Sequence, residues 1–213
     1  MIKEFSKSKD GNLYISKNFK VNEFACKDGT DYILIDLDMI PVLQRFRQYV
    51  ETSVSINSAY RTDSYNKKVG GASNSYHKKG KAFDIPFLSS YKYINSIDKM
   101  CDFFNTLGVH GIIKYSWGVH IDTRDIIYHA NNSGNLLNYG KINIPLYNNL
   151  SIGNINNDVG ILQFMLKYKF GININIDCNF GNNTYYAVKE FQKIKNLSID
   201  GIVGQNTWKE LIK

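Results

Sequence analysis

The pattern of apolar and polar residues predicts a mixture of helices and strands over the first two thirds of the chain. Apolar positions recur at helical spacing in residues 35–51 and 93–108, and Gly108 ends the second segment. Residues 62–79 are rich in Gly, Ser, Asn and Lys, which is typical of a loop. Four other segments alternate apolar and polar residues or form short apolar runs, as strands do. These segments are residues 53–61, 81–87, 111–117 and 118–124.

This order of elements predicts an α+β domain over residues 1–130, with a small antiparallel sheet and flanking helices. Residues 131–153 are rich in Asn, Gly, Leu and Tyr without clear periodicity, and we interpret them as a linker. Helical spacing returns in residues 157–170, 185–195 and 208–213. The chain is therefore expected to end in a small all-α domain of three helices, residues 154–213.

An internal repeat marks the second domain. The octets from Asp177 to Thr184 and from Asp200 to Thr207 share Asp, an apolar residue, Gly, Asn and Thr at identical spacing. Each octet precedes a predicted helix. The Asp can accept hydrogen bonds from turn N–H groups, the Gly permits a tight backbone, and Asn or Thr can cap the helix that follows.

The composition narrows the choice of partners without fixing it. The 213 residues carry a net charge of +7, so nucleic acid, a membrane surface or an acidic wall polymer are candidate partners. The alternative interpretation is that the positive charge serves only to keep the protein soluble. The three cysteines are widely spaced and form no CxxC pair, which excludes a cysteine zinc knuckle. The first residues show no apolar signal region, and no apolar run approaches the length of a membrane span. We therefore expect synthesis in the cytoplasm without a signal peptide, and no membrane insertion.

Two histidines and a carboxylate stand out as candidate metal ligands. Asp84 lies between Phe83 and Ile85 in an apolar strand, where an unpaired carboxylate is costly, and His77 precedes it by seven residues. His120 lies in a second strand of the same kind. Two imidazoles and one carboxylate that converge from two strands and a loop suit zinc, with the fourth position open to water as in catalytic sites. His110 and His129 are interpreted as structural or solvent-exposed.

The segments 58–85 and 117–124 resemble the zinc peptidases of the D-alanyl-D-alanine carboxypeptidase and L-alanyl-D-glutamate endopeptidase superfamily. The match covers most of residues 17–125. The positions that match the pattern of that superfamily are Ser75, His77, Gly80, Ala82, Asp84 and His120. The resemblance implies one zinc ion per chain, bound by the two histidines and the aspartate, and the stem peptide of peptidoglycan as the substrate class.

The resemblance also implies roles for residues around the metal. Arg61 is expected to bind a substrate carboxylate or the developing oxyanion, with a surface ion pair as the alternative. Tyr60 and Ser75 are expected to contact substrate. The alternatives for Ser75 are that it orients one of the metal ligands or only forms part of an ordinary turn. Trp117 occupies the position where several relatives carry an acidic general base. We therefore expect Asp122 to act as the base, and the competing role is to orient a ligand histidine.

Residues 156–213 resemble the three-helix peptidoglycan-binding domains that are often fused to wall hydrolases. The whole chain then resembles a bacteriophage endolysin: a monomer that acts at the bacterial cell wall after release through a holin, with peptidoglycan and anionic wall polymers as partners and no nucleic acid. The alternatives are a host-encoded wall-remodelling enzyme or spore-associated carboxypeptidase, and a non-catalytic wall-binding protein with a structural zinc site.

Overall fold

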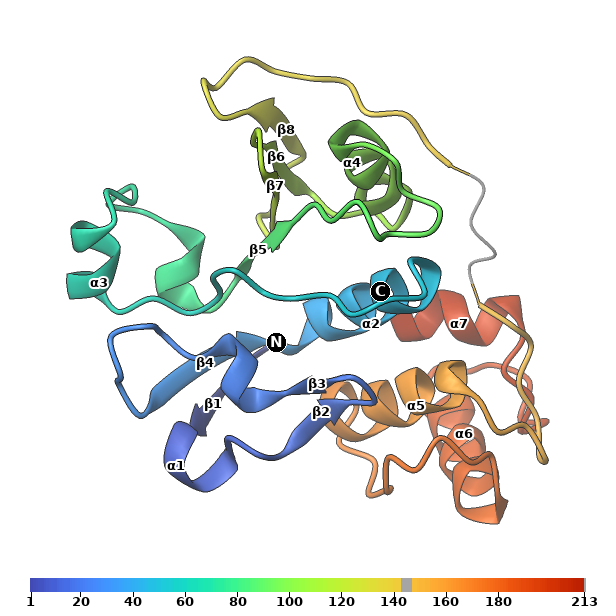
Figure 1. Cartoon of the computed structure of the whole chain (residues 1–213). Helices are drawn as coiled ribbons and strands as arrows, with labels where there is room; N and C mark the ends of the chain where they lie inside the picture. Colours follow the sequence, from blue (N-terminus) through green and yellow to red (C-terminus); the bar gives the residue numbers. More distant parts are fainter. Residues whose placement is uncertain (143–146, 213) are drawn as a thin grey trace. The chain divides into compact units, whose positions relative to one another are not determined.

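The computed structural model describes residues 1–142 and 147–212, which fall into two compact units (Figure 1). Residues 1–14 and 18–142 form unit 1, and residues 15–17 and 147–212 form unit 2. The predicted class is confirmed, because small sheets with flanking helices precede a helical C-terminal region. Among the residues described, no helix is both long and apolar enough to cross a membrane.

The main sheet of unit 1 has four strands in the order β5-β7-β6-β8. Strand β7 (Gly118–Asp122) pairs antiparallel with both β5 (Ala82–Pro86) and β6 (Gly111–Lys114), and all three lie within segments that were predicted as strands. Strand β8 (Tyr128–Asn131) was not predicted, and it runs parallel to β6. The sheet is therefore antiparallel except for this last pair.

Two helices of unit 1 were predicted from their apolar spacing. Helix α2 (Ile40–Tyr49) begins five residues later than expected, because the chain first completes a strand and then makes the 3-10 turn η2 (Leu37–Met39). Helix α4 (Ile97–Thr106) is capped by Ser96, whose side chain accepts a hydrogen bond from the backbone N–H of Lys99. Phe46 of α2 packs its ring against two phenylalanine rings of α4 in the core.

The chain before helix α2 contains short elements that the sequence pattern did not reveal. Strand β1 (Ile2–Ser6) pairs antiparallel with β4 (Tyr32–Asp36). The other elements are α1 (Lys7–Asp10), β2 (Tyr14–Ser16), β3 (Phe19–Lys20) and the 3-10 turn η1 (Val21–Phe24). Elements of two to five residues are too short to establish a periodicity, so the sequence could not separate them from loops.

Two local predictions between residues 53 and 79 are wrong. Residues 53–61 do not form a strand, since the only β pairing within them is an isolated bridge between Ser58 and Asp84. Their alternating pattern reflects an irregular segment that runs beside β5 with one side buried. The predicted loop 62–79 contains helix α3 (Asp63–Lys68) and the 3-10 turn η3 (Tyr76–Lys79).

Unit 2 is built from three helices around a core of its own. Helix α5 (Asn157–Phe164) continues into the π-helical turn η4 (Met165–Lys169), and α6 (Asn182–Ile194) and α7 (Gln205–Ile212) follow. Fully buried residues at the centre of this core include Leu162, Leu166, Phe180, Val188, Phe191 and Leu211.

The predicted linker, residues 131–153, is divided between the two units. Residues 131–142 belong to unit 1, where Asn105 of α4 donates hydrogen bonds to the backbone oxygens of Tyr139 and Gly140. In unit 2, Leu150 pairs with Val203. Residues 143–146 of the predicted linker lie outside the described residues.

The first repeated octet of unit 2 is organised by a buried glutamine. The side-chain nitrogen of Gln163 donates to Oδ1 of Asp177 (2.7 Å), the backbone oxygen of Asn179 (3.0 Å) and Oγ1 of Thr184 (2.9 Å). Asp177 Oδ1 also accepts the backbone N–H of Asn179, which is the turn bond expected from the sequence. Thr184 does not cap helix α6, because its hydroxyl is bonded to this turn and the N-cap is Gly181.

The second octet repeats the same device. The side-chain nitrogen of Gln192 donates to Oδ1 of Asp200 (2.8 Å) and to the backbone oxygen of Ile202 (2.9 Å). Its Oε1 accepts the backbone N–H of Gly201. Each octet is thus tied to the preceding helix by one buried amide whose donors and acceptor are satisfied.

We predict that Gln163→Ala and Gln192→Ala each lower the free energy of unfolding of unit 2 by about 1–3 kcal/mol, because turn donors and acceptors lose their buried partner. The measurement is urea denaturation of the full chain, followed by the fluorescence of Trp208 in a Trp117→Phe background. The exposed Gln205 of the same unit is the control, and Gln205→Ala is expected to change stability by less than about 0.5 kcal/mol. Equal effects in all three variants would contradict the assigned role of the buried amides.

Candidate metal centre

Asp84 and His120 meet because they lie opposite each other on neighbouring strands. Asp84 of β5 is paired in register with His120 of β7. Their side chains project from the same face of the sheet, since directly paired residues point the same way. Their strand neighbours Phe83, Ile85 and Ile121 are completely buried on the other face.

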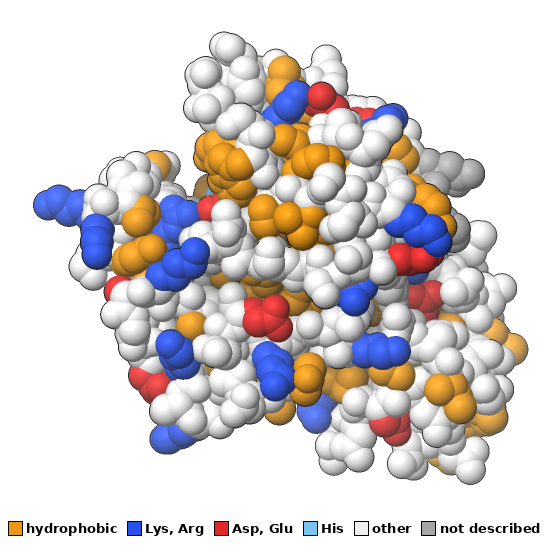
Figure 2. Space-filling view, viewed as in Figure 1, with side chains coloured by type: hydrophobic (Ala, Val, Ile, Leu, Met, Phe, Trp, Pro, Cys, Tyr) orange, Lys and Arg blue, Asp and Glu red, His pale blue; other side chains and the backbone are white. Residues whose placement is uncertain are grey.

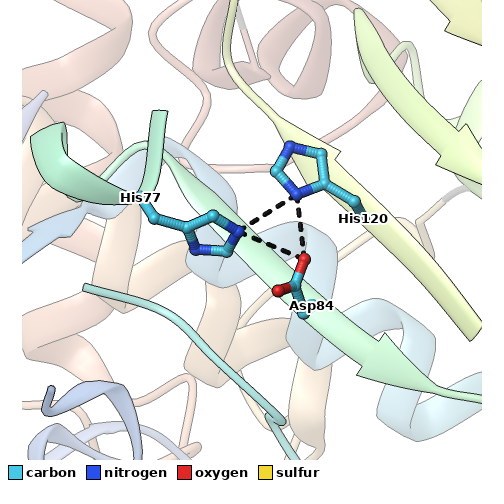
Figure 3. A group of neighbouring side chains, drawn as sticks. All are labelled: His77, Asp84 and His120. Atoms are coloured by element: carbon cyan, nitrogen blue, oxygen red, sulfur yellow. Dashed lines mark hydrogen bonds and ion pairs between the residues drawn. The ribbon is translucent and has the colours of Figure 1, made fainter. Parts of the chain in front are cut away.

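His77 reaches the same point from the turn before β5. It lies in η3, which ends at Gly80 with a left-handed φ of 67°. A Cβ atom at Gly80 would lie 2.5 Å from the backbone oxygen of Leu34, so only glycine fits this turn without displacement. The turn places the imidazole of His77 over the sheet face that carries Asp84 and His120 (Figure 3).

The three side chains bring one ligand atom each to a common centre. His77 Nε2 lies 3.2 Å from Asp84 Oδ1 and 3.1 Å from His120 Nδ1, and the third edge, from His120 Nδ1 to Asp84 Oδ1, is 2.9 Å. All three residues are buried, with at most 7% of their surface exposed. Tetrahedral zinc, with bonds of about 2.0–2.1 Å, places its ligand atoms about 3.3 Å apart. The donor set and its spacing therefore fit a small divalent cation.

Two of these ligands are fixed from behind by other groups. His77 donates its Nδ1–H to the backbone oxygen of Ala59 (2.7 Å), which leaves Nε2 to face the cluster. The second oxygen of Asp84, Oδ2, accepts a hydrogen bond of 2.7 Å from Arg61. The Nε of Arg61 donates in turn to the hydroxyl of Ser58 (2.7 Å).

Asp122 lies behind His120, on the side away from the cluster. His120 Nε2 is 3.0 Å from Asp122 Oδ2, whereas the cluster is formed by the opposite ring nitrogen. Both oxygens of Asp122 also accept hydrogen bonds from the guanidinium of Arg124. A general base needs an accessible oxygen next to the reacting water. The expected base role does not fit a completely buried carboxylate in this position, whereas the competing orienting role does.

Burial and hydrogen bonding shift the pKa values of the cluster in different directions. Burial opposes the ionised form of Asp84, but hydrogen bonds from His120 and His77 outweigh it and place its pKa well below the usual range. Burial lowers the pKa of His77. Burial acts in the same sense on His120, but its hydrogen bonds with Asp122 and Asp84 raise its pKa to about 9.

Three further residues were expected from the sequence to contact substrate, and the structure shows which protein groups each of them contacts. Arg61 donates hydrogen bonds to Asp84 and to Ser58, so its expected contact with substrate stays a prediction. Ser75 begins turn η3, and its backbone oxygen accepts from the N–H of Lys78. Tyr60 is 8% exposed and packs edge-on against Tyr32, which leaves little of its surface for a substrate.

The remaining histidines are not part of the cluster. His110 is exposed and its Nδ1 lies 2.9 Å from the backbone oxygen of Arg124. His129 is half-buried, and its ring packs at a tilt against Tyr139. Trp117 occupies the position at which the resemblance predicted an acidic general base; it is 41% exposed and stacks on Tyr115.

Three supporting contacts were missed by sequence reasoning: Ala59 with His77, Ser58 with Arg61, and Arg124 with Asp122. Ser58 and Ala59 act through a hydroxyl and a backbone oxygen, which carry no distinctive sequence signal. Arg124 follows the last strand residue by two positions, so its spacing from Asp122 was the one available clue.

Comparisons with known proteins agree with this division of the chain. Residues 17–122 match the model of the family described as Peptidase M15, and these residues include all three cluster side chains. Residues 156–211 match the family described as "Putative peptidoglycan binding domain".

Two solved structures match a smaller part of the chain. One is a peptidoglycan-binding protein from Clostridioides difficile in complex with glutamine hydroxamate, with 44% identity over 30% of this chain and a TM-score of 0.29. The chain spans 40% of the length of that protein. The other is the SleB N-terminal domain, with 34% identity over 30% of this chain and 89% of that one, and a TM-score of 0.30. At these TM-scores neither match bears on the fold.

The two family matches occupy separate parts of the chain, and the first contains the complete set of candidate metal ligands. The chain therefore contains a Peptidase M15 domain, followed by a peptidoglycan-binding domain.

Proposed function

We propose that this protein is a zinc-dependent peptidase that hydrolyses an amide bond in the stem peptide or cross-link of bacterial peptidoglycan. The observation that carries the proposal is the buried triangle of His77, Asp84 and His120 within a Peptidase M15 domain. Two imidazoles and one carboxylate leave a position open on the metal, as catalytic zinc requires. When bound, zinc would lower the pKa of its water and polarise the scissile carbonyl.

The residues around the ligands have orienting roles in this proposal. Ala59 fixes the ring of His77, Arg61 binds the free oxygen of Asp84, and Asp122 accepts the outer N–H of His120. Such contacts keep each ligand atom directed at the metal, and the acceptors on the outer N–H groups of His77 and His120 raise the basicity of the two imidazoles. We accordingly assign Asp122 to ligand orientation rather than to proton transfer.

We propose that the C-terminal domain anchors the enzyme to the wall. The match of residues 156–211 to a peptidoglycan-binding family supports this assignment. The net charge of +7 adds a general attraction to anionic wall polymers. On the face that Figure 2 shows, Lys and Arg side chains are dispersed rather than gathered in one patch, which favours a diffuse attraction over a specific anion site.

We propose an endolysin role for the chain: synthesis in the cytoplasm of an infected bacterium, release through a holin and cytolysis by wall hydrolysis. The pairing of a peptidase domain with a wall-binding domain supports this proposal. A host-encoded wall-remodelling or spore-associated carboxypeptidase uses the same two domains and is the alternative. Identification by mass spectrometry of the amino and carboxyl termini released from purified sacculi distinguishes an endopeptidase from a carboxypeptidase.

A second candidate function is a wall-binding protein in which zinc only stabilises the fold. The observation that favours it is the buried position of Asp122, together with Trp117 at the place of the expected acid. Retention of one zinc ion per chain without any hydrolysis of peptidoglycan would support this candidate over the peptidase.

We predict that the purified chain binds about one zinc ion and that zinc removal abolishes hydrolysis of purified walls. His77→Ala and His120→Ala are expected to weaken zinc binding at least about 100-fold, because each removes one of three protein ligands. His129→Gln, which changes a histidine outside the cluster, is the matched control and should bind zinc normally. Unchanged hydrolysis by a demonstrably metal-free preparation would contradict the proposed function.

We predict that zinc binding at pH 7 releases about one proton per chain. The pKa of about 9 keeps His120 protonated in the metal-free protein, and a cation at Nδ1 must displace that proton. His77 contributes none, because its lowered pKa leaves it neutral at this pH. The apparent affinity should therefore rise about tenfold per pH unit from pH 6 to 8. Isothermal titration calorimetry in buffers of different ionisation enthalpy measures the released proton, and its absence at pH 7 would contradict the prediction.

We predict that residues 147–213 alone sediment with insoluble walls and hydrolyse nothing. Residues 1–142 alone should cleave a soluble muropeptide as fast as the full chain does, but should degrade intact walls at least about tenfold more slowly, because tethering raises the effective substrate concentration. Added salt should weaken the electrostatic part of the wall binding. The anchoring role is wrong if residues 147–213 stay in the supernatant at low salt.

A further inference from the structure

The guanidinium of Arg124 contacts two tyrosine rings near the candidate metal centre. It is 5.1 Å from the ring centroid of Tyr76 and 4.5 Å from that of Tyr128, and the side chain is 14% exposed. Both distances are within the range of favourable cation–π contact. Arginine suits such a position better than lysine, because its planar group can stack on a ring while its edge donates hydrogen bonds.

The edge of this guanidinium is bound to Asp122 in a two-point arrangement. Nε of Arg124 donates to Oδ1 of Asp122 (2.8 Å), a terminal nitrogen donates to Oδ2, and the backbone N–H of Arg124 also donates to Oδ1 (3.1 Å). Asp122 is completely buried against Gly111, where a Cβ atom would lie 2.0 Å from Oδ1. The contacts with Arg124 hold the carboxylate in this orientation, and the absence of a side chain at position 111 leaves room for it.

These contacts connect Arg124 to both histidine-bearing segments of the metal centre. On one side, Asp122 contacts His120, whose Nε2 is 3.0 Å from Oδ2 of Asp122. On the other side, Tyr76 immediately precedes His77 in turn η3. One side chain thus contacts the turn that carries the first histidine and the carboxylate that orients the second.

We propose that Arg124 is a positioning residue of the metal centre, which sets the ring orientation of His120 through Asp122, while the rings of Tyr76 and Tyr128 hold its guanidinium in place. This inference rests on the proposed metal-binding function. Without the guanidinium, the buried Asp122 would be left with His120 and the backbone N–H of residue 124 as partners, and its carboxylate could turn away from His120 toward other donors. Nδ1 of His120 would then lose its fixed direction toward the cluster.

The first test is zinc affinity of the full-length, metal-free chain, measured by competition with a chromophoric chelator. Arg124→Gln and Arg124→Lys are expected to weaken zinc binding about 10–100-fold, because both lose the two-point contact with Asp122. Asp122→Asn should cause a loss of the same size. Arg47→Lys on helix α2 is the matched control, since it changes an arginine of unit 1 outside this set of contacts.

The double variant Asp122→Asn/Arg124→Gln separates positioning from a general contribution to stability. If Arg124 acts through Asp122, the double variant binds zinc within about threefold of Asp122→Asn alone. A merely structural ion pair would lower the thermal stability of Arg124→Gln while leaving zinc affinity of the folded protein unchanged. That result, or two additive losses in the double variant, would overturn the proposal.

A second measurement does not depend on metal binding. Crystal structures of the metal-free wild type and of Arg124→Lys, which keeps the charge and so favours folding, show whether Asp122 still contacts Nε2 of His120. We expect this contact in the wild type and its loss in the variant; an unchanged contact would overturn the inference. If the wild type binds no zinc at all, the proposed function fails, and the two crystal structures still decide the role of Arg124.

Discussion

The burial of three candidate metal-ligand atoms within 2.9–3.2 Å of one another is the constraint around which the main sheet of unit 1 is arranged. Two imidazoles and a carboxylate lose their hydration when they are buried, and that loss is costly unless other groups replace it. Each ligand is therefore bonded from behind: His77 by a backbone oxygen, Asp84 by Arg61, and His120 by Asp122. These outer contacts both offset the burial and fix the directions of the ligand atoms.

The sheet supplies the precision that this arrangement needs. Asp84 and His120 share a face because β5 and β7 pair in one register, and a slip of one residue would place them on opposite faces. Two glycines are required for this arrangement of side chains. Gly80 lets the chain turn from η3 into β5, and Gly111 leaves room for the carboxylate of Asp122.

Unit 2 uses polar burial for a different purpose. Gln163 and Gln192 each bond an Asp turn to the preceding helix, and the Oε1 and Nε2 of each amide have partners. The small core of this unit thereby gains two fixed connections without a disulfide, and its three-helix frame presents the same turn twice.

The sequence by itself determined the two-part organisation, the longer helices and the identity of the cluster residues. Helices α2 and α4 are long enough for their apolar period to be evident, and the carboxylate of Asp84 stands out because its neighbours are apolar. The short strands before residue 37, the parallel strand β8 and the irregular course of residues 53–61 depend on pairing with distant segments. Local pattern cannot encode such pairings.

The proposed role of Asp122 shows most clearly what depends on the tertiary structure alone. Alternation along β7 placed Asp122 on the same face as His120, which is equally compatible with a base and with an orienting partner. The choice depends on which ring nitrogen of His120 faces the cluster and on the guanidinium that Arg124 brings to both oxygens of Asp122. Ring orientation and side-chain contacts are set by packing in three dimensions. The sequence could therefore identify Asp122 as a candidate site residue but could not distinguish a general base from an orienting partner.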